Sequence, residues 1–234
     1  MLNLKKFYFL SVLIVTCFVF LSACGSLGQT KEKFVVALNS PHVQVGEIET
    51  QFNTFMSFGG LKKNLVKVFY YPREDAVCLQ YRREFTTYNQ FWSSTGRQTF
   101  LAALVQYNSE YNERTLTVQN RKNIRVYGNV GGYLYWQMYR FTVQAKSSVK
   151  VELGYQFRDN SPYFSIHQRE AEFKEEMTRD HDRTSPAITM YFTRAQASIL
   201  AEMFDQETLQ QALLTPTAEK ELGEEEFDGE RDAY

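Results

Sequence analysis

The sequence has few cysteines and prolines and no excess of either charge. Among its 234 residues are 3 cysteines, 5 prolines and 3 histidines, and 26 basic residues balance 27 acidic ones. Because the net charge is close to zero, nothing in the composition attracts the phosphate backbone of a nucleic acid, and we expect no nucleic-acid partner. The scarcity of proline and the 19 Phe and 15 Tyr residues favour strands around a filled core over disorder.

Short motifs that mark common active sites are also missing from the sequence. The chain contains no G-x-S-x-G, no H-E-x-x-H, no P-loop and no Rossmann glycine pattern. Gly128, Gly131 and Gly132 lack a following Lys-Ser/Thr and precede a strand-like run, so they predict a turn or bulge in preference to a phosphate cradle. We therefore expect no cofactor, and a non-enzymatic function is the leading hypothesis.

The N-terminus carries the most specific pattern in the chain. Lys5 and Lys6 precede an apolar run from Phe7 to Leu21, which is the order of a signal peptide and is somewhat short for a spanning helix of roughly 18 to 20 residues. The run ends in LSAC at residues 21–24, which resembles the bacterial lipobox. The resemblance implies a signal peptide at residues 1–23, cleavage before Cys24, and acylation of the Cys24 thiol and of the new amino group.

A multiply acylated Cys24 is sufficient for stable anchoring, because a single acyl chain holds a protein only marginally. The alternative is an uncleaved signal anchor with an incidental cysteine. Residues 24–33 are rich in Gly and Ser and predict a flexible tether. Under the resemblance Cys17 is removed with the signal peptide, so Cys78 has no partner for a disulfide.

The same resemblance bears on location and partners. Gly25 stands where some bacteria carry an aspartate that retains lipoproteins at the inner membrane, which favours the outer membrane over the inner one. We expect the folded part to lie in the periplasm or at the cell surface, with the membrane as partner through the N-terminal lipid and an envelope protein as a candidate second partner.

Residues 34–114 predict a unit in which strands precede a helix. Strands are expected at 34–38, 66–71 and 77–85, with a hairpin turn at 72–75 and weaker strand character around Val43 to Ile48. A helix over 95–112 follows, with a capping box from Thr95 to Gln98 and one apolar stripe. The stripe consists of Phe100, Leu101, Leu104, Val105 and Tyr111.

Residues 115–214 repeat this order of elements. Strands are expected at 133–143, 149–157, 163–173 and 187–192, followed by a capping box from Thr193 to Gln196 and a stripe of Ile199, Leu200, Met203 and Phe204. Similar short sequence motifs recur in the same order in both halves. The second half would carry two insertions, the larger one at the charged segment 174–185. We therefore expect an α+β fold in which two β-rich units, each ending in an α-helix, pack as a pseudo-symmetric internal duplication. The alternative is chance similarity between two amphipathic units.

This order of elements weakly resembles that of the PUR and Whirly folds, in which four-stranded sheets each carry a C-terminal helix. No motif supports the resemblance, and a fold by itself does not carry function. The near-zero net charge and the expected export both argue against nucleic-acid binding here. From Thr215 to Tyr234 the chain is strongly acidic, which predicts a solvated, disordered tail in preference to a site for cations or for a basic partner.

The strand expected at 133–143 is the candidate ligand or partner surface. Tyr133, Tyr135 and Tyr139 alternate onto one face, whereas Leu134 and Trp136 occupy the other. Because both faces are apolar, we expect this strand to be covered on both sides. The sharper hypothesis is an aromatic groove for a ligand, peptide or partner, because Tyr and Trp are frequent at interfaces. Its candidate residues are Tyr133, Tyr135, Trp136 and Tyr139.

The histidines support the second hypothesis, a lipid-anchored envelope hydrolase or metal-binding protein. His181 lies between Asp180 and Asp182, and His167 lies within an expected strand. A structural metal site needs about four donors, and no further histidine or cysteine stands at ligand spacing, so a solvated loop is favoured and no metal is expected. Convergence of these side chains in a cleft would favour the enzyme. We favour a membrane-anchored envelope lipoprotein that acts as a non-enzymatic binding or scaffolding module.

Overall fold

The computed structural model describes residues 34–53, 60–117, 125–138, 145–158, 160–173 and 184–214. The chain divides into a short N-terminal unit, Met1–Phe34, and a larger compact unit, Val35–Tyr234. All strands and helices discussed below belong to the larger unit. Within the described ranges, no helix has the length and apolar character needed to cross a membrane.

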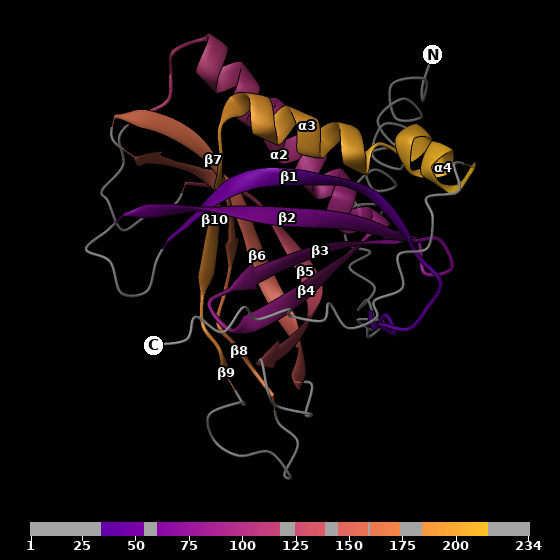
Figure 1. Ribbon diagram of the computed structural model, residues 1–234. Helices are drawn as coiled ribbons and strands as arrows, with labels where there is room; N and C mark the ends of the chain where they lie inside the picture. Colours follow the sequence, from indigo (N-terminus) through magenta and orange to yellow (C-terminus); the bar gives the residue numbers. More distant parts are fainter. Residues whose placement is uncertain are drawn as a thin grey trace, which may run out of the picture. The chain divides into compact units, whose positions relative to one another are not determined.

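Strands dominate the larger unit, and its helices follow β4 and β10 (Figure 1). The elements are β1 (Val43–Asn53), β2 (Leu61–Tyr71), β3 (Ala76–Arg83), β4 (Thr86–Ser93), α2 (Ser94–Asn112), β5 (Arg125–Met138), β6 (Ala145–Arg158), β7 (Ser161–Gln168), β8 (Ala171–Glu172), β9 (Thr184–Ser185), β10 (Ile188–Phe192), α3 (Arg194–Phe204) and α4 (Gln206–Leu214).

Eight strands form one closed antiparallel barrel in the order β1-β10-β7-β6-β5-β4-β3-β2. The barrel closes because β1 pairs with β2 along most of its length and with β10 at Gln51↔Tyr191 and Phe52↔Met190. β8 and β9 form a separate two-stranded sheet. Every barrel strand therefore has a hydrogen-bonded neighbour on each side, although β10 pairs with only a short part of β1.

The predicted duplication of two separately packed units is wrong. β4 pairs with β5 from Thr86↔Met138 to Trp92↔Gly132, so strands of both halves belong to one sheet. Each half's helix also packs against strands of the other half. Phe100 of α2 lies 5.5 Å from Phe164 of β7, and Phe204 of α3 lies 5.6 Å from Trp92 of β4, both between ring centroids. The fold is a single antiparallel barrel with associated helices.

Local turn and cap signals were more reliable than the long-range arrangement. The turn at residues 72–75 joins β2 to β3, and the capping box between Thr193 and Gln196 opens α3, so both predictions are confirmed. The predicted Thr95 cap is wrong, because Ser93 is the N-cap of α2 and accepts a hydrogen bond from the Gly96 amide. β4 was not predicted, and its residues form the central link between the two halves of the barrel.

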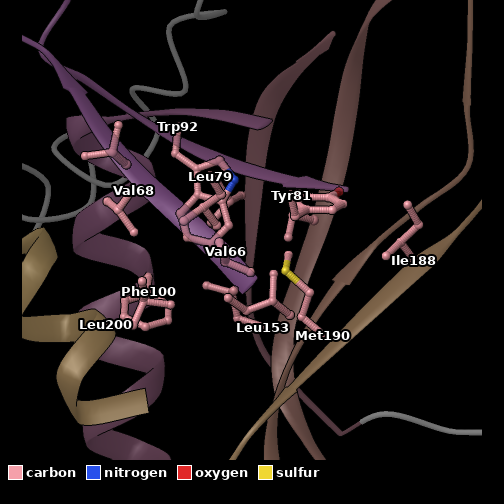
Figure 2. Packing of buried hydrophobic residues seen from close by; sticks show 14 of the residues in the cluster. Val66, Val68, Leu79, Tyr81, Trp92, Phe100, Leu153, Ile188, Met190 and Leu200 are labelled. Carbon is pink, nitrogen blue, oxygen red and sulfur yellow. The ribbon is translucent and has the colours of Figure 1, made fainter. Parts of the chain in front are cut away.

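The inner face of the barrel is filled by apolar side chains from strands and helices together. Residues on β2, β3, β4, β6 and β10 meet α2 and α3 in one cluster (Figure 2). Trp92, Phe100 and Leu200 are fully buried within it. Alternate strand positions point inward, as the period of two requires. The labelled members in Figure 2 are Val66, Val68, Leu79, Tyr81, Trp92, Phe100, Leu153, Ile188, Met190 and Leu200.

The apolar stripes predicted for the helices are partly wrong. Val105 of α2 is 70% exposed and Ile199 of α3 is 45% exposed, whereas both were expected in the core. The face of α2 that packs inward instead consists of Gly96, Arg97, Phe100, Ala103, Leu104 and Tyr107. The buried face of α2 is therefore rotated about the helix axis relative to the expected stripe. The pattern of apolar residues missed this face because it includes a glycine and an arginine.

Arg97 ties three elements together from a buried position. Its guanidinium donates to the Asp75 carboxylate in the β2–β3 turn and to Gln206 Oε1 at the start of α4, the latter at 3.1 Å. Tyr70 donates its hydroxyl to the same Asp75 carboxylate at 3.2 Å. The Arg97 side chain is 5% exposed and that of Asp75 is 48% exposed. Loss of Asp75 would leave a buried positive charge without its acidic partner, which is costly.

The packing of α3 predicts different costs for two adjacent truncations. Leu200→Ala should lower the free energy of unfolding by roughly 2 to 5 kcal/mol, because Leu200 is fully buried in the core. The matched control Ile199→Ala should change it by less than about 1 kcal/mol, because Ile199 is 45% exposed. Urea denaturation of both variants measures the difference. Equal losses would contradict the observed orientation of α3.

The Arg97 contact predicts that Asp75→Asn destabilises the fold by about 1 to 2 kcal/mol, less than for a fully buried pair because Asp75 is half exposed. Asn is a conservative replacement, since Asp75 has φ 45° and asparagine tolerates this region. The control Glu49→Gln breaks the exposed pair with Lys63 and should cost less than about 0.5 kcal/mol. Urea denaturation compares them, and an unaffected Asp75→Asn would show that the Arg97 contact contributes nothing.

Candidate functional site

Three of the four candidate residues lie on β5. Tyr133, Tyr135 and Trp136 are 5%, 7% and 5% exposed, respectively, and Tyr139 lies outside the described residues. Trp136 belongs to the inner core, whereas Tyr133 and Tyr135 lie on the outer face. The expectation that this strand is covered on both sides is confirmed for the three described residues.

The two tyrosines belong to an aromatic cluster on the outside of the barrel. Phe69, Cys78, Phe91 and Tyr133 lie opposite one another in a row across β2, β3, β4 and β5. Ring centroids are separated by 5.0 Å for Tyr71–Phe91, 5.8 Å for Phe91–Tyr135 and 5.1 Å for Tyr133–Tyr135. We call Tyr71, Cys78, Phe91, Tyr133 and Tyr135 the aromatic outer face.

A segment of the chain's own N-terminal region covers this face. Residues 35–42, which we call the strap, precede β1 and form no strand. Tyr135 donates its hydroxyl to the carbonyl oxygen of Val36 at 2.7 Å, and Tyr71 donates to that of Leu38 at 3.5 Å. Val36 is fully buried, although Val35 beside it is 46% exposed. Because Tyr71 is on β2 and Tyr135 is on β5, the strap crosses the two strands between them.

The C-terminal end of the strap is fixed at the β2–β3 hairpin. Ser40 closes a turn by donating its amide to the Ala37 carbonyl at 3.1 Å. Its hydroxyl donates to Glu74 Oε1 at 2.8 Å. The His42 ring stacks on Tyr71 with 4.7 Å between centroids. The strap is thus held at both ends by side chains of the barrel.

The prediction of a strand at 34–38 is wrong. The apolar run from Val35 to Leu38 has the composition of a strand. It lies instead across the outer face, where Tyr135 and Tyr71 donate to the carbonyls of Val36 and Leu38, and the Val36 side chain is buried. Val36 and Tyr71 were missed as site residues, and the signal for them was this run, misassigned to the sheet.

Burial keeps the groups beneath the strap uncharged. Desolvation raises the pKa of Tyr71 and of Tyr135, so both hydroxyls stay protonated and remain hydrogen-bond donors at physiological pH. Burial also raises the pKa of the Cys78 thiol well above its usual value. A buried, protonated thiol is a poor nucleophile. The two hydrogen bonds from Tyr71 and Tyr135 to the strap should therefore persist across the neutral pH range.

His167, the described residue among the enzyme candidates, lies on the outer face of β7. Its Nδ1 is 2.8 Å from the Thr189 hydroxyl, and its register partner on β6 is Glu152. Glu152 is already bonded to Arg169 at 2.8 Å and to Lys150 at 3.4 Å. Burial and the charge of Arg169 lower the pKa of His167 against the opposing effect of Glu152, which favours the neutral ring. Thr189 is 7% exposed, which leaves its hydroxyl little access to a substrate.

The remaining enzyme candidates, Asp180, His181 and Asp182, lie outside the described residues. The convergence with His167 that would favour the enzyme hypothesis therefore falls outside the described residues. Among the residues with a described position, no group of three or more His, Cys, Asp or Glu side chains is arranged to hold a metal ion.

Another polar cluster on the outside of the barrel was not predicted. The Arg158 guanidinium lies 4.9 Å from the centre of the Tyr191 ring and donates to Asn53 Oδ1 at 3.1 Å. Tyr191 donates its hydroxyl to Gln156 Oε1 at 2.8 Å. These contacts join β1, β6 and β10, so they stabilise the packing of these strands in the barrel wall.

Comparison with known proteins identifies the family of the chain. A family model described as uncharacterised Treponema protein matches residues 26–211, and the chain belongs to this family. No curated protein and no solved structure matches the chain.

The strap predicts that Val36→Asp exposes Cys78 to thiol reagents. A carboxylate at position 36 would lose its hydration in the docked strap, which is costly, so the strap should detach. Cys78 modification should accelerate at least roughly tenfold, the factor given by about 1.4 kcal/mol of lost docking. The measurement is the labelling rate in a soluble chain of residues 29–234. Val35→Asp is the control, because Val35 is 46% exposed. Equal rates in both variants would contradict the strap's protective role.

Proposed function

We propose that this member of the Treponema family is a lipid-anchored envelope lipoprotein that acts as a non-enzymatic binding or scaffolding module. The observation that carries the anchor is the sequence LSAC at residues 21–24, directly after a basic segment and an apolar run. Export, cleavage before Cys24 and acylation of that cysteine follow from this pattern. The absence of an aspartate at Gly25 favours the outer membrane.

The length of chain after Cys24 is compatible with this proposal. Val36 follows Cys24 by twelve residues, and such a length spans at most roughly 40 Å when fully extended. A lipid on Cys24 would therefore tether the folded unit to a membrane without any further anchor.

The packing of the barrel favours its outer surface as the binding surface. Eight-stranded barrels are just wide enough to be filled by side chains or to hold one small ligand. Here Trp92, Phe164 and Phe192 are fully buried, together with Phe100 and Phe204 from the helices. A core filled in this way supports a structural role for the interior and favours the exterior as the surface for recognition.

Acylation predicts that Cys24→Ala abolishes incorporation of radioactive palmitate and blocks cleavage, because the thiol is the acceptor for the diacylglyceryl group. Cys17→Ala is the matched control, since it changes a cysteine in the same N-terminal segment and should leave labelling intact. Labelling and gel mobility of the two variants in the native host test this. Normal labelling and processing of Cys24→Ala would overturn the lipoprotein assignment.

A further inference from the structure

The contacts of the strap define what the aromatic outer face can recognise. It holds two backbone carbonyls, those of Val36 and Leu38, through the hydroxyls of Tyr135 and Tyr71. In an extended chain residues i and i+2 face the same way. The third element of recognition is burial of the Val36 side chain. An occupant of this face therefore needs a partly extended backbone and a small aliphatic side chain.

The occupant also has to be uncharged at its centre. The strap residues from Val35 to Pro41 contain no acidic or basic side chain, and the face beneath them offers aromatic rings and a neutral thiol. A charged residue in the position of Val36 would be desolvated without a partner. The chemistry of the site thus selects a neutral, apolar peptide segment.

The strap is held less firmly than a strand of the barrel. It makes no ladder of backbone hydrogen bonds with a neighbouring strand, and its bond from Tyr71 is long, at 3.5 Å. Segments fixed by few contacts open locally at a lower free-energy cost than the whole fold. Opening would release Tyr71 and Tyr135, the two rings that the strap contacts, and exposed aromatic rings of this kind are frequent at interaction sites.

We infer that the aromatic outer face is a binding site for an extended, uncharged peptide segment of a partner protein, and that the strap occupies this site in cis. The inference deepens the proposed binding function and is independent of acylation at Cys24. The strap competes with the partner, so the apparent affinity for the partner falls with the fraction of molecules in which the strap is open. Exchange of straps between two copies is a separate outcome, which the experiment below distinguishes.

The test measures binding of a fluorescein-labelled peptide with the sequence of residues 35–42 to the full anchored chain, purified in detergent. Fluorescence anisotropy is compared for the wild type, Val36→Asp and the matched control Val35→Asp. The expected result is saturable binding to Val36→Asp that is at least roughly tenfold tighter than binding to the other two proteins. The same peptide carrying Val36→Asp should not bind, and adding Tyr135→Phe to the Val36→Asp protein should weaken binding severalfold.

Three results would overturn the inference. One is no peptide binding to any of the proteins, and another is equal binding to all three, because the peptide would then not compete with the strap. The third is a wild-type dimer in sedimentation that Val36→Asp converts to a monomer, because the occupant would then be a second copy. If Val36→Asp does not fold, Val36→Ala replaces it with the same expected direction. If the peptide binds but the chain incorporates no radioactive palmitate, only the lipid anchor is overturned and the binding inference stands.

Discussion

Closure of the barrel at β1 is the constraint on which the rest of the structure depends. β1 pairs with β10 at Gln51↔Tyr191 and Phe52↔Met190, and the Thr50 hydroxyl donates to the Tyr191 carbonyl at 2.6 Å beside this short seam. Gln196 in the capping box of α3 also donates its amide to the Glu49 carbonyl at 2.7 Å. The start of α3 thus reinforces the same strand. With this seam closed, every strand of the eight-stranded sheet has a hydrogen-bonded neighbour on each side.

Two consequences follow from closure, one on each side of the sheet. On the inside, helices from both halves of the chain pack into a shared core, so that Phe204 lies in contact with Trp92 and Phe100 although it is distant from them in sequence. On the outside, the aromatic cluster of β2 to β5 would face solvent. The apolar strap covers it instead, and Val36 becomes a buried residue on the exterior of the barrel.

The sequence allowed prediction of features that depend on neighbouring residues. The turn before β3, the Thr193 cap and the two apolar faces around Tyr135 all follow from turn chemistry, side-chain capping and a period of two. The stripe on α2 was only partly predicted, because its buried face includes Gly96 and Arg97. Arg97 is buried through its contacts with Asp75 and Gln206, which are remote in sequence.

The predicted duplication failed because the order of elements does not specify how two groups of strands join. Strands from β1 to β4 and from β5 to β10 could build two sheets or one, and the β4–β5 pairing that decides it involves a strand that was not predicted. The prediction of a strand at 34–38 failed for a related reason. Val35 to Leu38 has strand-like composition, but its position is set by contacts with Tyr71 and Tyr135, which are remote in sequence.

The central claim is that the strap is held against the outer face of a closed barrel. The most direct test is an NMR measurement of backbone order at Val36, together with nuclear Overhauser effects between the Tyr135 ring protons and residues 36 and 37. The structure predicts an order parameter near the rigid value of about 0.85 and cross-peaks to the Tyr135 ring. An order parameter below about 0.6 without such cross-peaks would show that the strap is free, and would contradict this account of the aromatic outer face.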